Sequence, residues 1–415
     1  MIARGIGCVK RTLGETLLAA LPGARVGDGV RVHSAAGTLC GEVSSLERSR
    51  VTIASFGSLA GVAVGDRVEV ATDALRVPAG FAILGRALDP SGAALDGRPL
   101  GDCLRVPVVR RAPAPAERGR IARPFWTGLR ALDGLLTIGR GARVGFFGAP
   151  GAGKTSLLET IVEGAVADAV VLALVGERGR EAQAWLGRLS RRTTIVCATS
   201  DRSASERVRA AEAAMTQAQY LSAAGLHVLL VLDSLARYAS ALREQRVALG
   251  EPVGRGGYPP AVWAELARYL ERAGSEARGS ITLLATVLAD DSDEREPLAD
   301  AARSLLDGHV VLSSALARTG HFPAIDVPAS TSRTMAAVTT AEHARDAGAV
   351  RAVLALLAES KDARAVGLGT GDPALRSAIA AEGALEAFLR QREFCPPPQT
   401  LRSLRSLAGL FEART

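Results

Sequence analysis

Lysine, aromatic residues and long apolar runs are scarce in this chain of 415 residues. Aromatic residues make up 4% of it, and no apolar run approaches the roughly 20 residues that a membrane-spanning helix requires. The first ten residues also lack the apolar core of a signal peptide. We therefore expect no transmembrane segment and a cytoplasmic location.

Cysteine is also rare. The five cysteines are Cys8, Cys40, Cys103, Cys197 and Cys395, and they show neither CxxC pairs nor a metal-binding spacing. This scatter argues against a disulfide framework, and we predict free thiols.

Arginine supplies almost all of the positive charge. The net charge is +7, and 47 of the 50 cationic residues are arginine because only Lys10, Lys154 and Lys361 are lysines. Such an excess is compatible with binding to nucleic acid or to an acidic membrane, and also with arginine spread over the whole surface. We favour the second interpretation, because a nucleic-acid footprint requires dedicated clustering.

The pattern of apolar residues divides the chain into three parts. In residues 1–77, short β-type runs alternate with glycine-containing turns, which predicts a small barrel or sandwich. From residue 143, continuous apolar runs alternate with helical periodicity, which predicts a mostly parallel sheet covered on both faces. After about residue 341, only amphipathic helices are expected. We therefore predict an α/β protein with an all-β domain at 1–77, a central domain at 78–343 and a helical domain at 344–415.

Residues 104–124 carry arginines broken by Ala-Pro repeats. Six arginines there accompany a single acidic residue, Glu117. This composition is typical of an exposed connection.

A phosphate-binding motif occurs in the segment GFFGAPGAGKTSLL. Gly148, Gly153, Lys154 and Thr155 have the G-x-x-x-x-G-K-T spacing, directly after an apolar strand and at the start of a helix. In this motif, backbone N–H groups surround the phosphates, the lysine reaches the β and γ oxygens, and the hydroxyl binds Mg²⁺. The predicted nucleotide-binding residues are Gly148, Ala149, Pro150, Gly151, Ala152, Gly153, Lys154, Thr155 and Ser156.

Two carboxylates end apolar strands downstream of this motif. Asp233 closes the run HVLLVLD, and we predict that it shares the magnesium shell with Thr155. Glu177 closes VVLALVGE, where a carboxylate can polarise the attacking water. Its alternative is a surface salt bridge with Arg178 or Arg180, and the residues alone leave these two roles open.

Several separated motifs carry a family resemblance. They are GAPGAGKT, VGERGRE, VLDSLARYA, GGYPPAVW, LERAG, SLLDGHVVLS, GHFPAIDVPASTSR and LRQ. Together they resemble the type III secretion ATPases, a family of injectisome and flagellar export ATPases related to the catalytic subunit of rotary ATP synthases. The resemblance covers nearly the whole chain. It implies a RecA-like P-loop NTPase core between an N-terminal small β-barrel and a C-terminal helical domain.

The resemblance also implies roles for single residues. Glu177 is implied to be the catalytic carboxylate, with Arg178 beside the phosphates and Arg237 near the carboxylate. Arg333 is similar to the arginine finger that reaches a neighbouring subunit's nucleotide. Phe322 falls where the family packs an aromatic ring on adenine, although a core role needs only the same ring. Since one chain carries both carboxylate and finger, every interface of a ring can be catalytic, which predicts a homohexamer.

The implied ligands are ATP and Mg²⁺. The implied partners are secretion chaperones, effector proteins, stator and central-stalk proteins, and the inner-membrane export gate, at whose cytoplasmic face the ring would associate peripherally. Residues 250–260 resemble the loop that lines the ring's pore. Two departures from the family are an N-terminal stator-binding helix that is short or absent and a proline-interrupted C-terminal part.

Three alternatives accompany this interpretation. A flagellar export ATPase has the same fold and reaction. An RNA-translocating ring needs a stacking platform, yet residues 1–77 contain only Phe56 as an aromatic and nearly balance nine Lys or Arg with seven Asp or Glu, so nucleic acid is not an expected partner. A non-catalytic nucleotide-binding ring subunit would not need Lys154, Glu177, Asp233 and Arg333 together.

Overall fold

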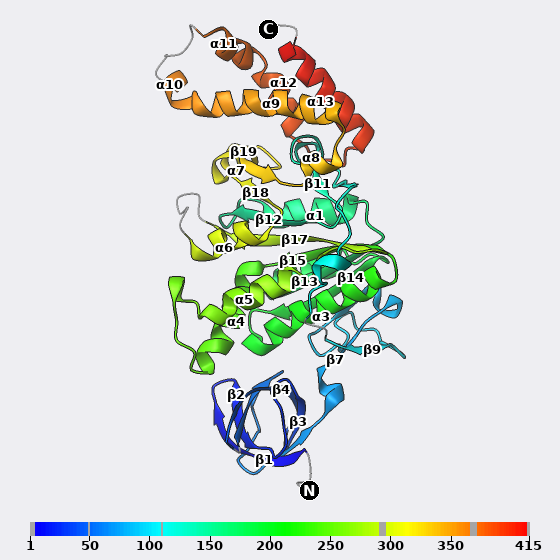
Figure 1. Ribbon diagram of the computed structural model, residues 1–415, viewed down its shortest axis with the longest axis vertical. Helices are drawn as coiled ribbons and strands as arrows, with labels where there is room; N and C mark the ends of the chain where they lie inside the picture. Colours follow the sequence, from blue (N-terminus) through cyan, green and yellow to red (C-terminus); the bar gives the residue numbers. More distant parts are fainter. Residues whose placement is uncertain (1–4, 49, 109–110, 290–295, 366–371, 413–415) are drawn as a thin grey trace. The chain divides into compact units, whose positions relative to one another are not determined.

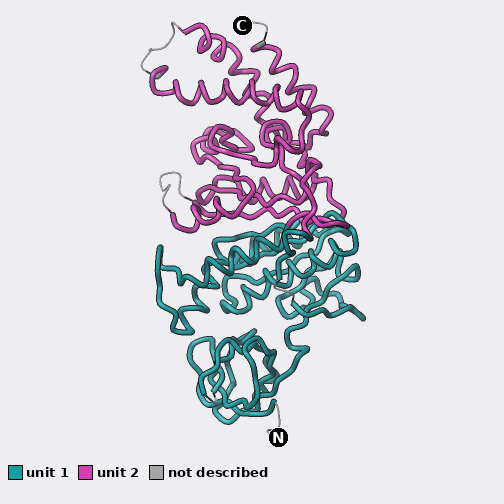
Figure 2. The backbone as a smooth tube through the Cα atoms, in the orientation of Figure 1, with its two compact units in different colours: residues 1–116, 169–273 teal, residues 117–168, 274–415 magenta. Residues whose placement is uncertain are grey.

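The computed structural model describes residues 5–48, 50–108, 111–289, 296–365 and 372–412 (Figure 1). The chain forms two compact units, each made of two separate stretches (Figure 2). Unit 1 contains residues 1–116 and 169–273, and unit 2 contains residues 117–168 and 274–415. These units follow contacts rather than chain order, and the domain boundaries at residues 77 and 343 stay a prediction.

Unit 1 begins with a closed six-stranded barrel in the order β1-β2-β5-β4-β3-β6. The strands are β1 (Ile6–Leu13), β2 (Thr16–Ala20), β3 (Gly29–Ser34), β4 (Gly37–Glu47), β5 (Arg50–Ser55) and β6 (Arg67–Val70). Neighbouring strands are antiparallel, and β1 pairs with β6 to close the barrel. Alternate residues such as Val30 and Val32 are fully buried, as the period of a strand requires. The expected N-terminal all-β fold is confirmed.

The remainder of unit 1 is built on four parallel strands in the order β15-β13-β14-β8. They are β8 (Arg86–Leu88), β13 (Ala169–Glu177), β14 (Thr193–Thr199) and β15 (His227–Asp233). The central strand β13 is buried along its whole length, which explains its uninterrupted apolar sequence. The helices are α2 (Gly179–Leu186), α3 (Ala204–Ala223), α4 (Leu235–Ala248) and α5 (Pro260–Leu270), with one-turn helices η1 (Thr72–Leu75), η2 (Phe81–Ile83) and η5 (Arg255–Gly257).

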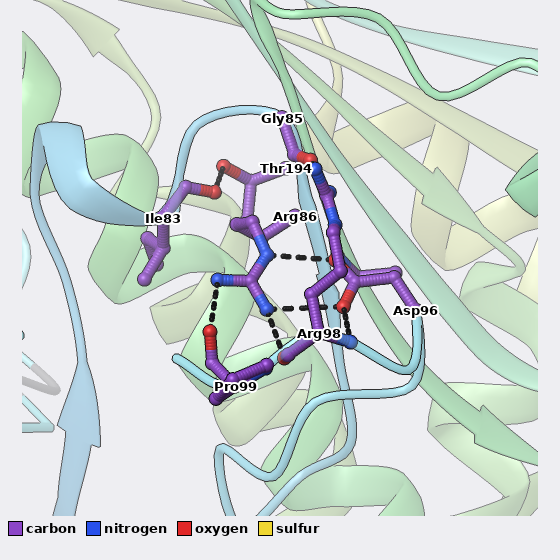
Figure 3. A network of polar contacts seen from close by, with 8 residues as sticks. Ile83, Gly85, Arg86, Asp96, Arg98, Pro99 and Thr194 are labelled. Carbon is purple, nitrogen blue, oxygen red and sulfur yellow. Dashed lines mark hydrogen bonds and ion pairs between the residues drawn. The ribbon is translucent and has the colours of Figure 1, made fainter. Parts of the chain in front are cut away.

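A polar network holds the short edge strand β8 in place (Figure 3). The Arg86 guanidinium binds both carboxylate oxygens of Asp96, at 2.7 and 3.0 Å, and donates to the carbonyl oxygens of Arg98 and Pro99. Beside it, the Thr194 hydroxyl of β14 donates to the Ile83 carbonyl at 2.8 Å. These bonds fasten residues 83–99 to the rim of the sheet.

The arginine-rich connection is more regular than its composition suggests. Strand β9 (Arg105–Pro107) pairs antiparallel with β7 (Arg76–Pro78), and η3 (Pro115–Glu117) follows. Its described residues are exposed or half-buried, as predicted. The short β7–β9 pair lies within this exposed connection, because backbone pairing tolerates exposed side chains.

Unit 2 contains a second set of strands in the order β19-β18-β12-β17. Strand β12 (Arg143–Gly148) lies between β17 (Ser280–Leu288) and β18 (Gly308–Leu312) and runs parallel to both. Strand β19 (Ile325–Ser332) is antiparallel to β18. The smaller strands are β10 (Pro124–Phe125), β11 (Ile138–Gly139) and β16 (Gly274–Ser275), and the associated helices are η4 (Ala131–Leu135), α1 (Lys154–Gly164), α6 (Pro297–Leu305), α7 (Ser314–Arg318) and α8 (Met335–Val338).

Helices alone follow α8 in the described part of unit 2. They are α9 (Ala341–Glu359), α10 (Lys361–Ala365), α11 (Pro373–Ala380), α12 (Glu382–Leu389) and α13 (Pro397–Glu412), and α13 packs along α9 (Figure 1). The helical C-terminal part was expected and is confirmed. Across the described ranges, none of the helices combines the length and the apolar character needed to cross a membrane. All five cysteines are free thiols, as predicted.

Candidate active site

The phosphate-binding loop lies in unit 2, between the end of β12 and the start of α1. Gly151 and Gly153 have φ angles of +83° and +89°, which residues with a side chain rarely adopt. The Nζ of Lys154 donates to the carbonyl oxygens of Gly148 at 2.5 Å and Ala149 at 2.8 Å, so the ammonium lies across the loop. Thr155 is exposed in the first turn of α1. This strand, loop and helix N-terminus have the geometry that binds a phosphate.

Phe322 lies against the same loop. A Cβ atom at Gly153 would stand 3.5 Å from Cε1 of Phe322, and the phenylalanine is 45% exposed. A core aromatic would be buried, so the interpretation of this residue as part of the core does not hold. The exposed ring is available for stacking on a planar base.

Gln391 fixes the segment that carries Phe322, although the sequence alone gave it no role. Its backbone N–H donates to the Phe322 carbonyl at 2.9 Å. Its side chain donates to the Gly128 carbonyl at 2.6 Å and accepts from the Arg130 N–H at 2.7 Å. The LRQ motif was the available signal, but its spacing from Phe322 does not reveal this contact.

Glu177 ends β13 in unit 1 and is 8% exposed. Its Oε1 lies 3.0 Å from Nε of Arg237, and Nη1 of Arg237 donates to the Gly176 carbonyl at 2.6 Å. Burial, a hydrogen bond with Glu181 and the nearby Asp233 carboxylate raise the pKa of Glu177, against the opposing effect of Arg237. The pKa of Glu177 is thereby raised to about 8, near enough to a working pH for this group to exchange a proton with water.

Glu181, on α2, is a second residue to which the sequence alone gave no role. It shares a hydrogen bond with Glu177, which lowers the pKa of Glu181. Arg178 is largely exposed, with Nη1 3.8 Å from Oε1 of Glu181. The sequence left open whether Glu177 polarises water or forms a salt bridge with Arg178 or Arg180. In the structure its ion-pair partner is Arg237 instead. The repeated acids of GERGRE were the signal for Glu181, since α2 begins at Gly179, two residues after Glu177.

Asp233 is 8% exposed at the end of β15, with Leu174 of β13 as its partner in the strand register. A carboxylate here and the hydroxyl of Thr155 are oxygen donors of the kind that Mg²⁺ prefers. The described residues contain no group of three or more His, Cys, Asp or Glu side chains suited to holding a metal.

Arg333 lies at the opposite end of the unit 2 strands from the phosphate-binding loop. It follows Ser332, which pairs with Gly308, and Gly308 pairs with Val144 near the start of β12. The loop follows Gly148, at the end of that strand, and the four residue steps from Val144 to Gly148 place the two positions about 13 Å apart along the strand. The backbone N–H of Arg333 donates to Asp307, and its exposed guanidinium donates to the Arg303 carbonyl at 3.3 Å. The backbone of Arg333 is thus held at the end of the strands far from its own loop.

Comparisons with known proteins identify the family. The nucleotide-binding domain of the ATP synthase alpha/beta family matches residues 128–332. A type 3 secretion system ATPase from Sinorhizobium fredii is 44% identical over 398 residues, which covers 93% of this chain and 88% of the relative. The chain belongs to the type III secretion ATPase family. The flagellum-specific ATP synthase of Pseudomonas aeruginosa, from the same family, is 42% identical over 84% of this chain and 80% of that protein.

A solved structure supports the same assignment for the fold. The assembled ATPase EscN from the type III secretion system of enteropathogenic E. coli matches with a TM-score of 0.91 and 37% identity, over 97% of this chain and 100% of EscN. EscN in complex with its central stalk EscO matches with a TM-score of 0.88. The fold is therefore that of a family member with a barrel, a nucleotide-binding α/β domain and C-terminal helices. The protein is an ATPase, and a nucleotide is its substrate.

Proposed function

We propose that this chain works as the homohexameric ATPase motor of a bacterial type III protein secretion system. The single observation on which the proposed ring rests is the position of Arg333, at the far end of the strands from the loop of its own subunit. A side chain there is useful to hydrolysis when it faces the nucleotide of a neighbour. The similarity to EscN, whose solved structure is that of an assembled ATPase, supports an assembly of this kind.

In the proposed mechanism, the loop binds the phosphates and Phe322 stacks on the base. Glu177, held by Arg237, orients and deprotonates the attacking water. Arg333 of the neighbour neutralises the charge that develops on the transferred phosphoryl group, a contribution on the order of 10³ to 10⁵ in rate. Mg²⁺, held by Thr155 and Asp233 directly or through water, would neutralise phosphate charge when bound.

The test mixes two inactive variants, Glu177→Gln and Arg333→Ala. A subunit with Arg333→Ala still carries Glu177, and a neighbour with Glu177→Gln still carries Arg333, so this pair can form one complete site. In a random ring of equal parts, one half of the subunits keep Glu177 and one half of their finger donors keep Arg333, so about a quarter of the sites are complete. Recovery of about that share of the wild-type rate is the expected result.

Two controls make the mixing test specific. Each variant alone is expected to be inactive while retaining the mass of a hexamer by mass photometry. A mixture that stays inactive although mixed rings form, or an Arg333→Ala variant with wild-type activity, contradicts the finger in trans. Activity per subunit that does not rise with hexamer formation contradicts the ring as the active species.

The proposed partners are secretion chaperones and effector proteins, whose release and unfolding would be driven by ATP hydrolysis. Stator and central-stalk proteins and the inner-membrane export gate complete the proposed setting, at the cytoplasmic face of the membrane. The complex of EscN with its central stalk EscO supports the stalk as one of them. An assay in which an active hexamer fails to release a cognate chaperone from its effector would contradict this part.

Flagellar export is the second candidate function. It is favoured by the flagellum-specific relatives from Pseudomonas aeruginosa and Treponema pallidum, each 42% identical to this chain. Complementation of an injectisome ATPase deletion and of a flagellar ATPase deletion in one host distinguishes the two: secretion of effectors supports the first, and restored swimming supports the second.

A further inference from the structure

Helix α3 links the catalytic edge of unit 1 to the barrel. The Ser200 N–H donates to the Glu177 carbonyl at 3.0 Å, just before the helix begins. Ser203 and Glu206 then form a capping box, with the Ser203 N–H donating to Glu206 at 3.0 Å. The start of α3 is therefore only a few residues from the backbone of Glu177, and a shift of one moves the other.

The barrel binds the first residue of this helix. Glu15, in the turn between β1 and β2, accepts a hydrogen bond from the Ala204 N–H at 2.8 Å. A carboxylate is favoured at this position because the first N–H groups of a helix lack partners within the helix and carry partial positive charge. The barrel thus caps the helix that begins beside the catalytic edge.

Arg209 of α3 makes a second contact with the barrel. Its guanidinium carbon lies 4.3 Å from the centre of the Phe56 ring, within the range of a cation–π interaction. The same buried guanidinium donates to the carbonyl oxygens of Pro90 at 3.0 Å and Ala74 at 2.9 Å. Phe56, the aromatic residue of the barrel, thus contacts α3 through Arg209.

A cavity lies beside these contacts, between the barrel and the helices. It has a volume of about 630 Å³ and separates barrel residues such as Glu42 from residues of α3, α4 and α5, including Tyr238 and Tyr269. An open space of this size means that no continuous apolar core joins the two parts there. The contacts of Glu15 and Arg209 therefore contribute much of what positions the barrel against α3.

We propose that Glu15, Phe56 and Arg209 form a joint through which the barrel positions the start of α3 and, with it, Glu177. They are positioning residues, and the inference rests on the proposed function in taking Glu177 as the catalytic carboxylate. Displacing a catalytic group by about 1 Å lowers a rate by up to roughly 100-fold. Breaking the joint lowers kcat and leaves nucleotide binding unchanged, since the phosphate-binding loop belongs to unit 2.

The experiment uses the full chain with Phe56→Leu, Glu15→Ala, which removes the acceptor for the Ala204 N–H, and the conservative Phe56→Tyr. Phe81→Leu and Glu47→Ala are matched controls, because both residues are exposed and lie outside the joint. The measurements are kcat, KM for ATP, hexamer mass and amide hydrogen exchange of residues 199–206. We expect Phe56→Leu and Glu15→Ala to lower kcat about ten-fold, with KM within about two-fold and faster exchange in that segment. Phe56→Tyr keeps the cation–π contact and the wild-type kcat.

Two outcomes overturn the joint. One is a wild-type kcat in both Phe56→Leu and Glu15→Ala. The other is a loss of activity that follows a loss of hexamer mass, because the barrel would then act through assembly alone. Glu177→Gln in the same assay separates this inference from the proposed function. If that variant stays active, the catalytic assignment fails; if it is inactive while joint variants are normal, only the joint fails.

Discussion

The two halves of the proposed site are built from different groups: the phosphate-binding loop uses backbone, and the end of β13 around Glu177 (the Glu177 edge) uses side chains. The loop offers the backbone of one continuous segment, with Thr155 exposed and two glycines at positive φ. The Glu177 edge offers a buried carboxylate held by side chains from α2 and α4. A site made of backbone can be recognised from a short motif, whereas one made of side-chain contacts depends on segments far apart in the sequence.

Substitution of Lys154 tests the phosphate-binding loop and should have the largest effect on the rate of hydrolysis. Lys154→Ala removes the cation that reaches the β and γ phosphates, and we expect the rate of hydrolysis to fall by about 10³ or more. Lys361→Ala is the matched control, because this exposed lysine on α10 is one of only three lysines in the chain. Phosphate release measured at saturating ATP gives the answer, and substantial activity in Lys154→Ala would contradict the role of the loop.

Substitution of Glu177 tests the Glu177 edge, the part of the proposed site that is built from side chains. Glu177→Gln keeps the shape but cannot accept a proton, so kcat is expected to fall by about 10² to 10⁴. Binding of a fluorescent ATP analogue should persist, since the loop is intact. Glu181→Gln keeps the catalytic carboxylate and should cost less, which kcat under the same conditions measures. An equal loss in both variants would mean that the pair, rather than Glu177, is the functional unit.

Substitution of Phe322 tests how the loop region binds the base of the nucleotide. Phe322→Ala removes the ring beside Gly153, and base stacking on an aromatic is worth about 1 to 3 kcal/mol, so KM should rise about ten-fold with little change in kcat. Phe322→Tyr retains the ring and should retain KM. Initial rates over a range of ATP concentrations separate the two constants. A fall in kcat at unchanged KM would assign Phe322 to the structure of the loop instead.

Asp96 should have the smallest effect on catalysis. The Arg86 guanidinium holds the pKa of Asp96 well below its usual range, so the folded state is stabilised above the unfolded pKa and this contribution is lost as pH falls through the folded value. Asp96→Asn should therefore lower the free energy of unfolding by about 3 kcal/mol at pH 7, with a smaller difference in acid. Denaturant titrations at pH 7 and pH 2 measure it, because at pH 4 the ion pair still contributes almost fully; the exposed Asp102→Asn is the control. A difference that does not shrink in acid would contradict the ion pair.

The strands and the loop could be predicted from the sequence for a physical reason. Buried parallel strands such as β13 need continuous apolar runs, and the turn into α1 needs glycine at fixed places, so both leave local signals. The LRQ motif marks Gln391 without revealing its partner, because a hydrogen bond over 69 residues from Phe322 to Gln391 has no period or spacing. The family resemblance supplied Arg237 and Arg333, whose positions propensity alone would not have singled out.

The placement of Arg333 opposite its own loop would, on the proposed function, give each copy two unlike faces, one that donates a finger and one that receives it. On the proposed function, contacts between copies are head-to-tail, so an open row always has one receiving face left empty at its end. Two copies complete one site, and three complete two. Only when the last face meets the first does the number of complete sites equal the number of chains, so ring closure adds a working site without adding a subunit.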